Sequence, residues 1–333
     1  MALRVAVVGA GVVGLSATAA LLERGAEVVC YERAGAPMQE RSAGSSRIFR
    51  LAHRAPELVR LAAGACAGFD RWAQQSGRTM IVPSGCVISG PDVPEWAAAM
   101  SAAGAPFETT SSPERLRLPV RRAPAEALVD LSGGVVDVDA VRAHLTALTR
   151  QAVVGEPVEV VDHGATVWTP SGRSRFDVVL LAAGAGTPPL AAQVGIEVPG
   201  GLEHHARFTF PVDPAVPWRC WIDTPADGLG TYQHASGPGG WAVGAHLGPA
   251  ATAWELDRAD ATAAARDAVL AYAREHLVVE PRVVETVYCT PTPGLGDGFH
   301  VQQRGRVLAV HGENLFKLAP LLGTTLATAC ETA

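Results

Sequence analysis

The amino-acid sequence predicts an α/β fold in which a discontinuous parallel-sheet domain carries an inserted antiparallel-sheet domain. Residues 4–9 form an apolar, β-branched run, residues 12–24 repeat apolar side chains at helical spacing, and residues 27–32 form a second apolar run. This order predicts two parallel strands joined by a helix. A further apolar run at residues 177–183 predicts a buried strand of the same sheet, supplied from far along the chain.

The rest of the chain alternates between helical and strand-like patterns. Residues 203–247 show strand-like alternation broken by glycine-rich turns, which predicts an antiparallel sheet. Prolines interrupt residues 105–125, and we expect this segment to be irregular. We expect Asp139 to cap a helix that runs to residue 151. Further helices are expected at residues 56–75, 92–103, 257–276 and 318–330, and further strands at residues 79–89, 134–138, 157–161, 165–169, 282–290, 298–302 and 306–311.

These patterns divide the chain into two interleaved domains. The parallel-strand pieces assign residues 1–75, 130–200 and 283–333 to the first domain. The strand-rich pieces between them assign residues 76–129 and 201–282 to a second domain, which is inserted twice into the first. With 333 residues, the chain has the length for two packed domains.

Composition and charge argue against several classes of protein. Hydrophobic residues make up 48% and charged residues 18% of the chain, as in a globular protein with a large core. The net charge of −6 does not favour binding to nucleic acid or to an anionic membrane. No apolar run approaches the roughly 18 residues needed to cross a bilayer, and the first residues lack the features of a signal peptide. We therefore expect a cytoplasmic protein.

The rare residue types also carry information. The 6 cysteines are scattered without a CxxC or zinc spacing, so we expect reduced and mostly buried thiols. Of the 27 basic residues, only Lys317 is a lysine. Because every other basic position holds arginine, the ammonium group retained at Lys317 indicates a site too small for a guanidinium.

A dinucleotide-binding motif lies between the first strand and the first helix. Residues 9–14 read GAGVVG, which is the GxGxxG pattern. Gly9 allows the tight turn, Gly11 lets a pyrophosphate approach the backbone, and Gly14 lets the helix pack on the strand. Glu32, at the end of the second strand, can accept hydrogen bonds from ribose hydroxyls. The first domain is therefore predicted to be of the Rossmann type. Both FAD and NAD use this motif, and its single copy at the N-terminus favours FAD.

Three further segments accompany the motif. Residues 44–50 read GSSRIFR, residues 287–292 read VYCTPT, and residues 311–317 read HGENLFK. A weaker match is residues 244–246, GAH. Together with the motif and Glu32, these segments resemble the sarcosine oxidase-like branch of the D-amino-acid oxidase superfamily. Their order and spacing cover nearly the whole chain, although it is shorter than typical members.

The resemblance implies an FAD cofactor that is covalently linked. The family cysteine that matches Cys289 is joined to the flavin ring, a bond that needs a thiolate beside the ring. The alternative for Cys289 is a buried, inert thiol. Arg47 matches a residue near the flavin, where positive charge stabilises the reduced, anionic ring; a loop salt bridge is the alternative. The implied cofactor-binding positions are Gly9, Gly11, Val13, Gly14, Glu32, Arg33, Ser45, Ser46, Arg47, Gly184, Cys289, Gly312, Asn314, Leu315, Phe316 and Lys317.

The resemblance also implies a substrate site. Arg50 and Lys317 match two cations that hold the substrate carboxylate, and His246 matches a histidine that lines the pocket. The alternative is a surface role for these side chains. The implied activity is oxidation of the C–N bond of a secondary or cyclic amino acid, an N-methyl or imino acid, to an imine, with oxygen as acceptor. We expect a small-molecule amine or amino-acid substrate, no nucleic-acid or membrane partner, and a monomer or small homo-oligomer.

The chain departs from the family pattern at four positions. Ala242 stands where family oxidases keep a lysine that helps oxygen to accept electrons, and no second lysine exists to replace it. Pro291 replaces a frequent tyrosine, and Ala43 and Asn314 replace frequent histidines. Four alternatives therefore stay open: a flavin-dependent dehydrogenase with another acceptor, a flavin monooxygenase, an NAD-dependent dehydrogenase, and a non-catalytic flavin-binding subunit.

Overall fold

The structure is a computed structural model that describes residues 2–333. The chain forms two compact units. Unit 1 contains the N-terminal residues up to Ala43, together with Ala140–Leu202 and Thr292–Ala333. Unit 2 contains Gly44–Asp139 and Glu203–Pro291. Each unit has its own sheet, so the units are described one at a time.

Unit 1 is built on a six-stranded sheet with the strand order β19-β20-β13-β1-β2-β9. β1 (Arg4–Val8) pairs in parallel with β2 (Glu27–Tyr31) and with β13 (Val178–Leu181), as the sequence predicts. β1 and β13 are almost fully buried, which explains their continuous apolar sequence. The remaining strands are β9 (Val153–Val154), β20 (Val307–Glu313) and β19 (Gly298–Arg304), of which only β19 runs antiparallel to its neighbour.

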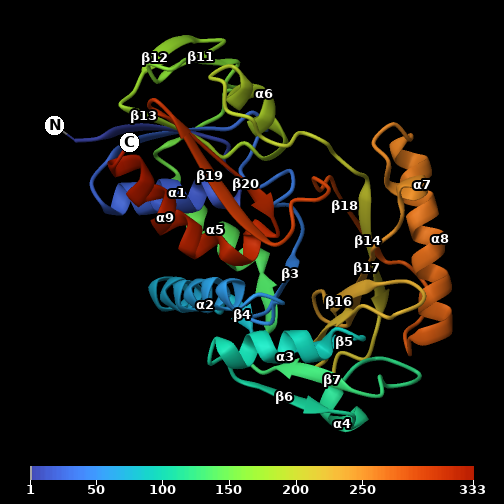
Figure 1. Cartoon of the computed structure of the whole chain (residues 1–333). Helices are drawn as coiled ribbons and strands as arrows, with labels where there is room; N and C mark the ends of the chain where they lie inside the picture. Colours follow the sequence, from blue (N-terminus) through green and yellow to red (C-terminus); the bar gives the residue numbers. More distant parts are fainter. Residues whose placement is uncertain (1) are drawn as a thin grey trace. The chain divides into compact units, whose positions relative to one another are not determined.

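Helices pack beside this sheet. α1 (Val12–Glu23) follows β1 and ends before Gly25, whose φ of 81° closes the helix in the left-handed conformation. α1 and α9 (Ala319–Glu331) lie side by side (Figure 1), and Leu15 and Leu326 are fully buried there. The other elements of unit 1 are α5 (Val138–Thr149), α6 (Thr187–Ala192), the 3-10 turns η1 (Gly184–Gly186) and η2 (Leu315–Leu318), and the small sheet of β10 (Val160–Val161), β11 (Thr166–Thr169) and β12 (Gly172–Arg175).

Unit 2 contains an eight-stranded sheet with the strand order β18-β14-β17-β16-β15-β5-β7-β6. Its strands are β5 (Cys86–Ser89), β6 (Phe107–Thr110), β7 (Ala127–Asp130), β14 (His205–Pro211), β15 (Cys220–Asp223), β16 (Thr231–Ala235), β17 (Gly240–Ala245) and β18 (Glu285–Cys289). All neighbours are antiparallel except β5 and β15. A second sheet joins β3 (Ser46–Phe49), β8 (Gly134–Asp137) and β4 (Ile81–Val82). The predicted α/β class, with a Rossmann-type unit and an inserted antiparallel sheet, is confirmed.

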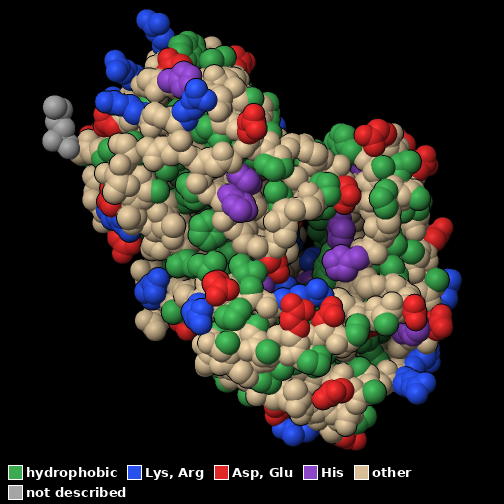
Figure 2. All heavy atoms as spheres, in the orientation of Figure 1, with side chains coloured by type: hydrophobic (Ala, Val, Ile, Leu, Met, Phe, Trp, Pro, Cys, Tyr) green, Lys and Arg blue, Asp and Glu red, His purple; other side chains and the backbone are tan. Residues whose placement is uncertain are grey.

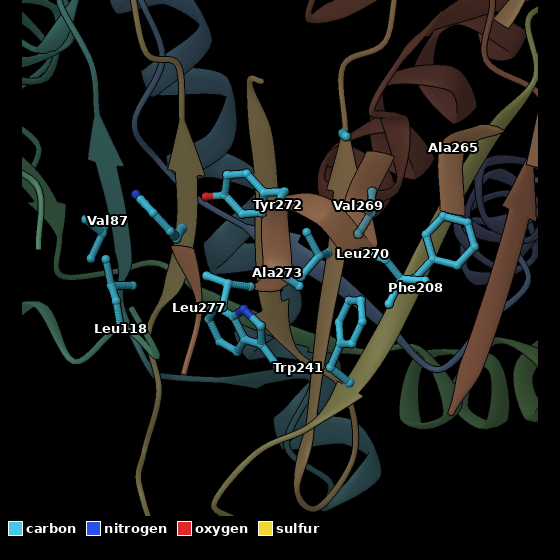
Figure 3. Packing of buried hydrophobic residues seen from close by; sticks show 14 of the residues in the cluster. Val87, Leu118, Phe208, Trp241, Ala265, Val269, Leu270, Tyr272, Ala273 and Leu277 are labelled. Carbon is cyan, nitrogen blue, oxygen red and sulfur yellow. The ribbon is translucent and has the colours of Figure 1, made fainter. Parts of the chain in front are cut away.

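The main core of unit 2 lies between its large sheet and α8 (Arg258–His276). Figure 3 shows side chains from α8 close to Phe208 and Trp241 of the sheet. Asp257 caps α8, because its side chain accepts hydrogen bonds from the backbone N–H groups of Ala259 and Asp260. The other helices of the unit are α2 (Pro56–Ser76), α3 (Val93–Ala102), α4 (Pro113–Leu116) and α7 (Pro249–Thr252). Within residues 2–333, no helix has the length and apolar character needed to span a membrane.

Three sequence-based expectations are wrong in detail. α5 begins at Val138, so Asp139 lies inside its first turn, where a carboxylate favours the helix dipole, and is not its cap. Residues 105–125 are not irregular throughout, because β6 pairs with β7 and α4 begins at Pro113, a position that needs no backbone N–H. β12 was not expected, since all of its residues are exposed and it carries no apolar alternation.

The compact units follow different boundaries from the predicted domains. Residues 44–75, 130–139 and 283–291, which the sequence assigned to the nucleotide-binding domain, belong to unit 2. The reason is strand pairing: β3 pairs with β8, and β18 pairs with β14. Strand pairing of this kind joins distant segments and leaves no local signal in the sequence. Which unit contacts cofactor and which contacts substrate stays a prediction.

The substitution Phe208→Ala is expected to lower the free energy of unfolding by about 3–5 kcal/mol, because it leaves a cavity in a tightly packed core. Phe208 is fully buried in the core of unit 2. Urea unfolding followed by circular dichroism measures the change. Val278→Ala is the control: Val278 is 58% exposed, and its substitution should change the free energy by less than about 0.5 kcal/mol. Equal losses in the two variants would contradict this account of the core.

Candidate functional site

The glycine turn of unit 1 has the geometry that the motif predicts. Gly9 has a φ of 102°, in the left-handed region, and a Cβ there would lie 2.6 Å from the carbonyl oxygen of Ala182. A Cβ on Gly14 would lie 1.9 Å from the carbonyl oxygen of Gly9. Neither position can hold a larger residue without moving the backbone. The turn therefore brings the first residues of α1 close to the end of β1, as the close approach of a phosphate requires.

The first turn of α1 is completed by a residue that the sequence did not reveal. Gly11 is the N-cap of α1 and has no side chain to cap it. Instead, the Ser42 hydroxyl, which is buried, accepts a hydrogen bond from the Val12 N–H at 3.0 Å. Ser42 comes from the loop after β2, 30 residues along the chain. No local pattern identifies such a partner, because the contact depends on how the loop folds back.

Glu32 holds the glycine turn from the tip of β2. Its carboxylate accepts hydrogen bonds from the backbone N–H groups of Ala10 and Ala34, each at 2.8 Å. Each oxygen uses one lone pair in this way, so lone pairs remain for ribose hydroxyls. The neighbouring Arg33 is exposed and pairs with Glu40. The strand, the glycine turn, the helix N-terminus and the carboxylate all fit the phosphates and ribose of FAD.

The other predicted cofactor positions of unit 1 lie at the ends of strands. Gly184 begins the turn η1 that follows β13, and Gly312 is part of β20. A Cβ on Gly312 would lie 2.3 Å from the carbonyl oxygen of Gly298, so a larger residue cannot replace it. Asn314 has a φ of 54° and precedes the turn η2, which contains Leu315, Phe316 and Lys317.

Lys317 is buried and paired with an acid. Its side chain is 6% exposed, and its Nζ lies 3.0 Å from Oδ1 of Asp297. Asn314 donates a hydrogen bond to the same oxygen at 2.8 Å. Asp297 was not identified from the sequence, because it lies outside the HGENLFK segment. An ammonium group carries three donors, and the Asp297 carboxylate accepts from one of them.

In unit 2, Arg47 and Arg50 lie on and just after the edge strand β3. The Arg50 guanidinium stacks over the Trp96 ring at 5.0 Å and donates a hydrogen bond to the Ala52 carbonyl. The buried Asp130 accepts hydrogen bonds from the Leu51 and Ala52 N–H groups and so fixes the turn after β3. Burial raises the pKa of Asp130, while these hydrogen bonds and Arg50 act in the opposite direction. Asp130 is thus a positioning residue for Arg50 that the sequence did not reveal.

Cys289 lies next to a histidine in unit 2. Its Sγ is 3.5 Å from Nδ1 of His205, and the two residues are register partners on β18 and β14. Burial, reinforced by His246 and Arg207, lowers the pKa of His205 to about 4. The imidazole is therefore neutral at physiological pH and can accept a hydrogen bond from the thiol, but its low pKa makes it a weak base. His205 was missed because only the strand pairing brings it to the cysteine.

Tyr232 connects this histidine to the predicted His246. The Tyr232 ring stacks on His205 with a centroid distance of 5.6 Å and tilts against the exposed His246 at 5.9 Å. Burial raises the pKa of Tyr232, with Cys289 adding to the rise and two arginines, Arg207 and Arg47, opposing it. The structure thus brings the predicted Arg47, His246 and Cys289 together around Tyr232. The period-two spacing of His205 and Arg207 was the one available signal for this face of β14.

Ser45 and Ser46 begin the same segment of unit 2. The Ser45 carbonyl accepts a hydrogen bond from the Val138 N–H, and Ser46 is buried at the start of β3. The Ser46 carbonyl accepts hydrogen bonds from Arg47 at 2.8 Å and Arg207 at 3.1 Å. Ser46 therefore orients two guanidinium groups in unit 2.

The family can now be assigned. A family model described as FAD dependent oxidoreductase, DAO, matches residues 4–329. The chain belongs to the DAO family of FAD-dependent oxidoreductases. The family expected from the sequence motifs is confirmed. No curated protein matches the chain by sequence.

Solved structures of this fold resemble the chain along nearly its whole length. NikD, described as an unusual amino acid oxidase essential for nikkomycin biosynthesis, is 22% identical to this chain with a TM-score of 0.83. The match covers 98% of this chain and 94% of that chain. Glycine oxidase from Geobacillus kaustophilus is 19% identical to this chain with a TM-score of 0.78. The match covers 99% of this chain and 95% of that chain. L-proline dehydrogenase from P. horikoshii is 14% identical to this chain with a TM-score of 0.79. The match covers 99% of this chain and 94% of that chain. At these identities the likeness establishes the fold.

The stability of the protein is expected to depend on pH through His205. Its pKa is about 4 in the folded chain against an ordinary value of 6.5. As pH falls from 6.5 to about 4, the unfolded chain binds a proton that the folded chain does not. The free energy of unfolding should therefore fall in this window by up to about 3 kcal/mol, with no contribution above it. Urea unfolding at a series of pH values should show a shallower decline in His205→Gln.

The matched control is His163→Gln, which changes an exposed histidine. It should follow the wild-type profile. An identical slope in His205→Gln and in wild type would refute the neutral assignment.

Proposed function

We propose that the chain oxidises the C–N bond of a secondary or cyclic amino acid, an N-methyl or imino acid, to an imine. The family supplies the FAD-dependent oxidoreductase activity, and the neighbours named above include an amino acid oxidase and a proline dehydrogenase. The observation that carries the proposal is the burial of Lys317, the chain's only lysine. Burying an ammonium group is costly and is typical of a position that binds an anion.

In this proposal, Arg50 and Lys317 bind the substrate carboxylate. Arg50 offers a planar fork of donors that stacking on Trp96 and the turn held by Asp130 keep in one orientation. Lys317 offers a compact charge, oriented by Asp297. The bound FAD supplies a two-electron acceptor. In this proposal the substrate amine binds in its neutral form, and the protein side chains orient it. Because the amine nitrogen carries no extra proton, oxidation requires no side-chain base.

The proposal includes a covalent bond between Cys289 and the flavin. A thiol must lose its proton to act as a nucleophile. The neutral His205 imidazole, 3.5 Å away, can accept a hydrogen bond from the thiol at Nδ1. Cys289 is also less buried than Cys30, Cys220 and Cys330, which favours a reactive role over that of an inert thiol. Burial raises the pKa of these three thiols to about 12.

Oxygen is the proposed electron acceptor, with a non-oxygen acceptor as the second candidate. Ala242 favours the second candidate, because it is fully buried and takes the place of the family lysine that assists oxygen. Such a chain would act as a flavin-dependent dehydrogenase. The monomeric or small oligomeric state and the cytoplasmic location remain predictions from the sequence.

The covalent bond is tested by acid denaturation. Precipitated wild-type protein is expected to keep its yellow colour, because the flavin is bonded to Cys289. Cys289→Ala should release the colour into the supernatant, and absorbance of the two fractions measures the split. Cys66→Ala alters a half-buried thiol of α2 and should behave as wild type. Colour retained by Cys289→Ala would place the bond elsewhere, and colour lost by all three proteins would exclude it.

The carboxylate role of Lys317 is tested against its pairing with Asp297. Lys317→Met should raise the Kd for N-methyl and cyclic amino acids by about tenfold or more, because a charge-assisted contact is lost. Flavin content should stay unchanged. Anaerobic titration, followed by bleaching of the flavin, measures the Kd.

Asp297→Asn is the matched control. It removes the ion pair but keeps the ammonium group, so substrate should bind as tightly as to wild type or more tightly. If both variants lose affinity equally, the role of Lys317 is to hold Asp297, and the carboxylate assignment is wrong.

A further inference from the structure

Arg219 in unit 2 is a partly buried cation without an acidic partner. It lies directly before β15, and its Nε is fully buried without a hydrogen-bond partner. Within residues 2–333, its side chain forms neither a hydrogen bond nor an ion pair. Burying a guanidinium with unmet donors is costly unless an acceptor completes it.

The Arg219 guanidinium packs against a backbone that carries no side chain. A Cβ built on Gly85 would lie 2.4 Å from Nη1 of Arg219 and 3.3 Å from its Cζ. The Gly85 carbonyl also accepts a hydrogen bond from the Cys220 N–H at 3.0 Å, which joins the two segments. Most visible Lys and Arg side chains in Figure 2 project at the surface instead. Arg219 is therefore more restricted in position than an ordinary surface arginine.

Arg117 brings a second guanidinium to the same place. Its carbonyl accepts a hydrogen bond from the Arg219 N–H at 3.1 Å. Arg117 is half-buried and has a φ of 48°, a left-handed conformation that is uncommon for a residue with a side chain. In the described part of the chain, its side chain also forms no hydrogen bond or ion pair. The turn after α4 thus holds together two arginines that lack an ion pair.

The charges that act on Arg219 are mostly positive. Burial is the main cause that lowers its pKa; Arg117 and Arg115 act in the same direction, and Glu108 opposes them. Glu108 already forms an ion pair with the exposed Arg115. Three guanidiniums and one carboxylate leave this cluster with a net charge of +2. Like charges repel each other most where water is partly excluded, so the cluster favours a bound anion.

We propose that Arg219, Arg117 and Arg115 form a binding site in unit 2 for a tetrahedral phosphate dianion. A dianion balances the net charge of the cluster. Guanidinium donors match phosphate oxygens, and a tetrahedral oxyanion offers acceptors in more directions than a carboxylate does. Two sources have this chemistry: free phosphate and the phosphate group of a monoester. The site goes beyond the proposed oxidation and requires neither the flavin nor the amino acid.

The test is calorimetric titration of the full chain with inorganic phosphate, at constant ionic strength and about pH 8, where phosphate is a dianion. Wild-type protein should bind phosphate, and sulfate should compete with it. Arg219→Met should raise the Kd about tenfold, because a charge-assisted contact is lost. Arg219→Lys should raise it by less, since it keeps the charge but loses the fork.

The matched control is Arg282→Met, which removes an exposed arginine that pairs with Glu280. It should bind phosphate as wild type does. Absence of binding to wild type, or an equal Kd in wild type and Arg219→Met, overturns the proposal. An equal rise in Arg282→Met also overturns it, because the effect would then follow from net charge alone.

Arg117→Met guards against a variant that does not fold. Circular dichroism first establishes which variants are folded. If Arg219→Met is not, Arg117→Met takes its place: a Kd raised about tenfold supports the site, and an unchanged Kd overturns it. Titration with phenyl phosphate then identifies the source. Tighter binding than that of inorganic phosphate indicates a monoester, and equal or weaker binding indicates free phosphate; both outcomes support the site.

Discussion

Compensation of buried positive charge is the constraint on which both units depend. Unit 1 buries Lys317 against the carboxylate of Asp297. Unit 2 buries Arg207 to the same extent but gives it a carbonyl and a neutral imidazole as partners. A carbonyl dipole offsets a full charge only in part. The ammonium group therefore has an acidic partner within its own unit, whereas the guanidinium has no ion pair within residues 2–333.

The same charges determine how the neighbouring histidines behave. Burial lowers the pKa of His205 and of His234, so both rings stay neutral. His246 and then Arg207 add to the effect at His205, and Arg207 and Arg47 add to it at His234. A neutral ring next to Cys289 can accept a hydrogen bond from the thiol, which a protonated ring cannot do. Arg207 lies two residues from His205 on β14, and His205 is the register partner of Cys289 on β18. The cluster around Arg207 is therefore connected to the thiol through His205. Acid would protonate these rings only at a cost in folding stability.

Local patterns in the sequence were sufficient for the first strand, the glycine turn and the first helix of unit 1. They were also sufficient for placing Cys289 and Lys317 in recognisable segments. They could not reveal Ser42, Asp297 or His205, because each of these acts through a contact made by a distant segment. The compact units also follow other boundaries than the predicted domains, because strand pairing places β3 and β18 in unit 2. Composition and spacing describe a residue's neighbours in sequence, whereas these partners are neighbours only in space.

A lysine at position 242 could both stabilise an anion and deliver a proton, whereas Ala242 can do neither. Ala242 on β17 is a register partner of Thr209 on β14 and of His234 on β16. Arg207 is thus two residues from the partner of Ala242 and can supply positive charge on this sheet. A guanidinium stays protonated at all accessible pH values, so it stabilises an anion but does not deliver a proton, whereas a buried ammonium group can do both. Charge stabilisation without proton delivery suits an acceptor that brings its own proton donor, which is the physical reason to keep a non-oxygen acceptor beside oxygen.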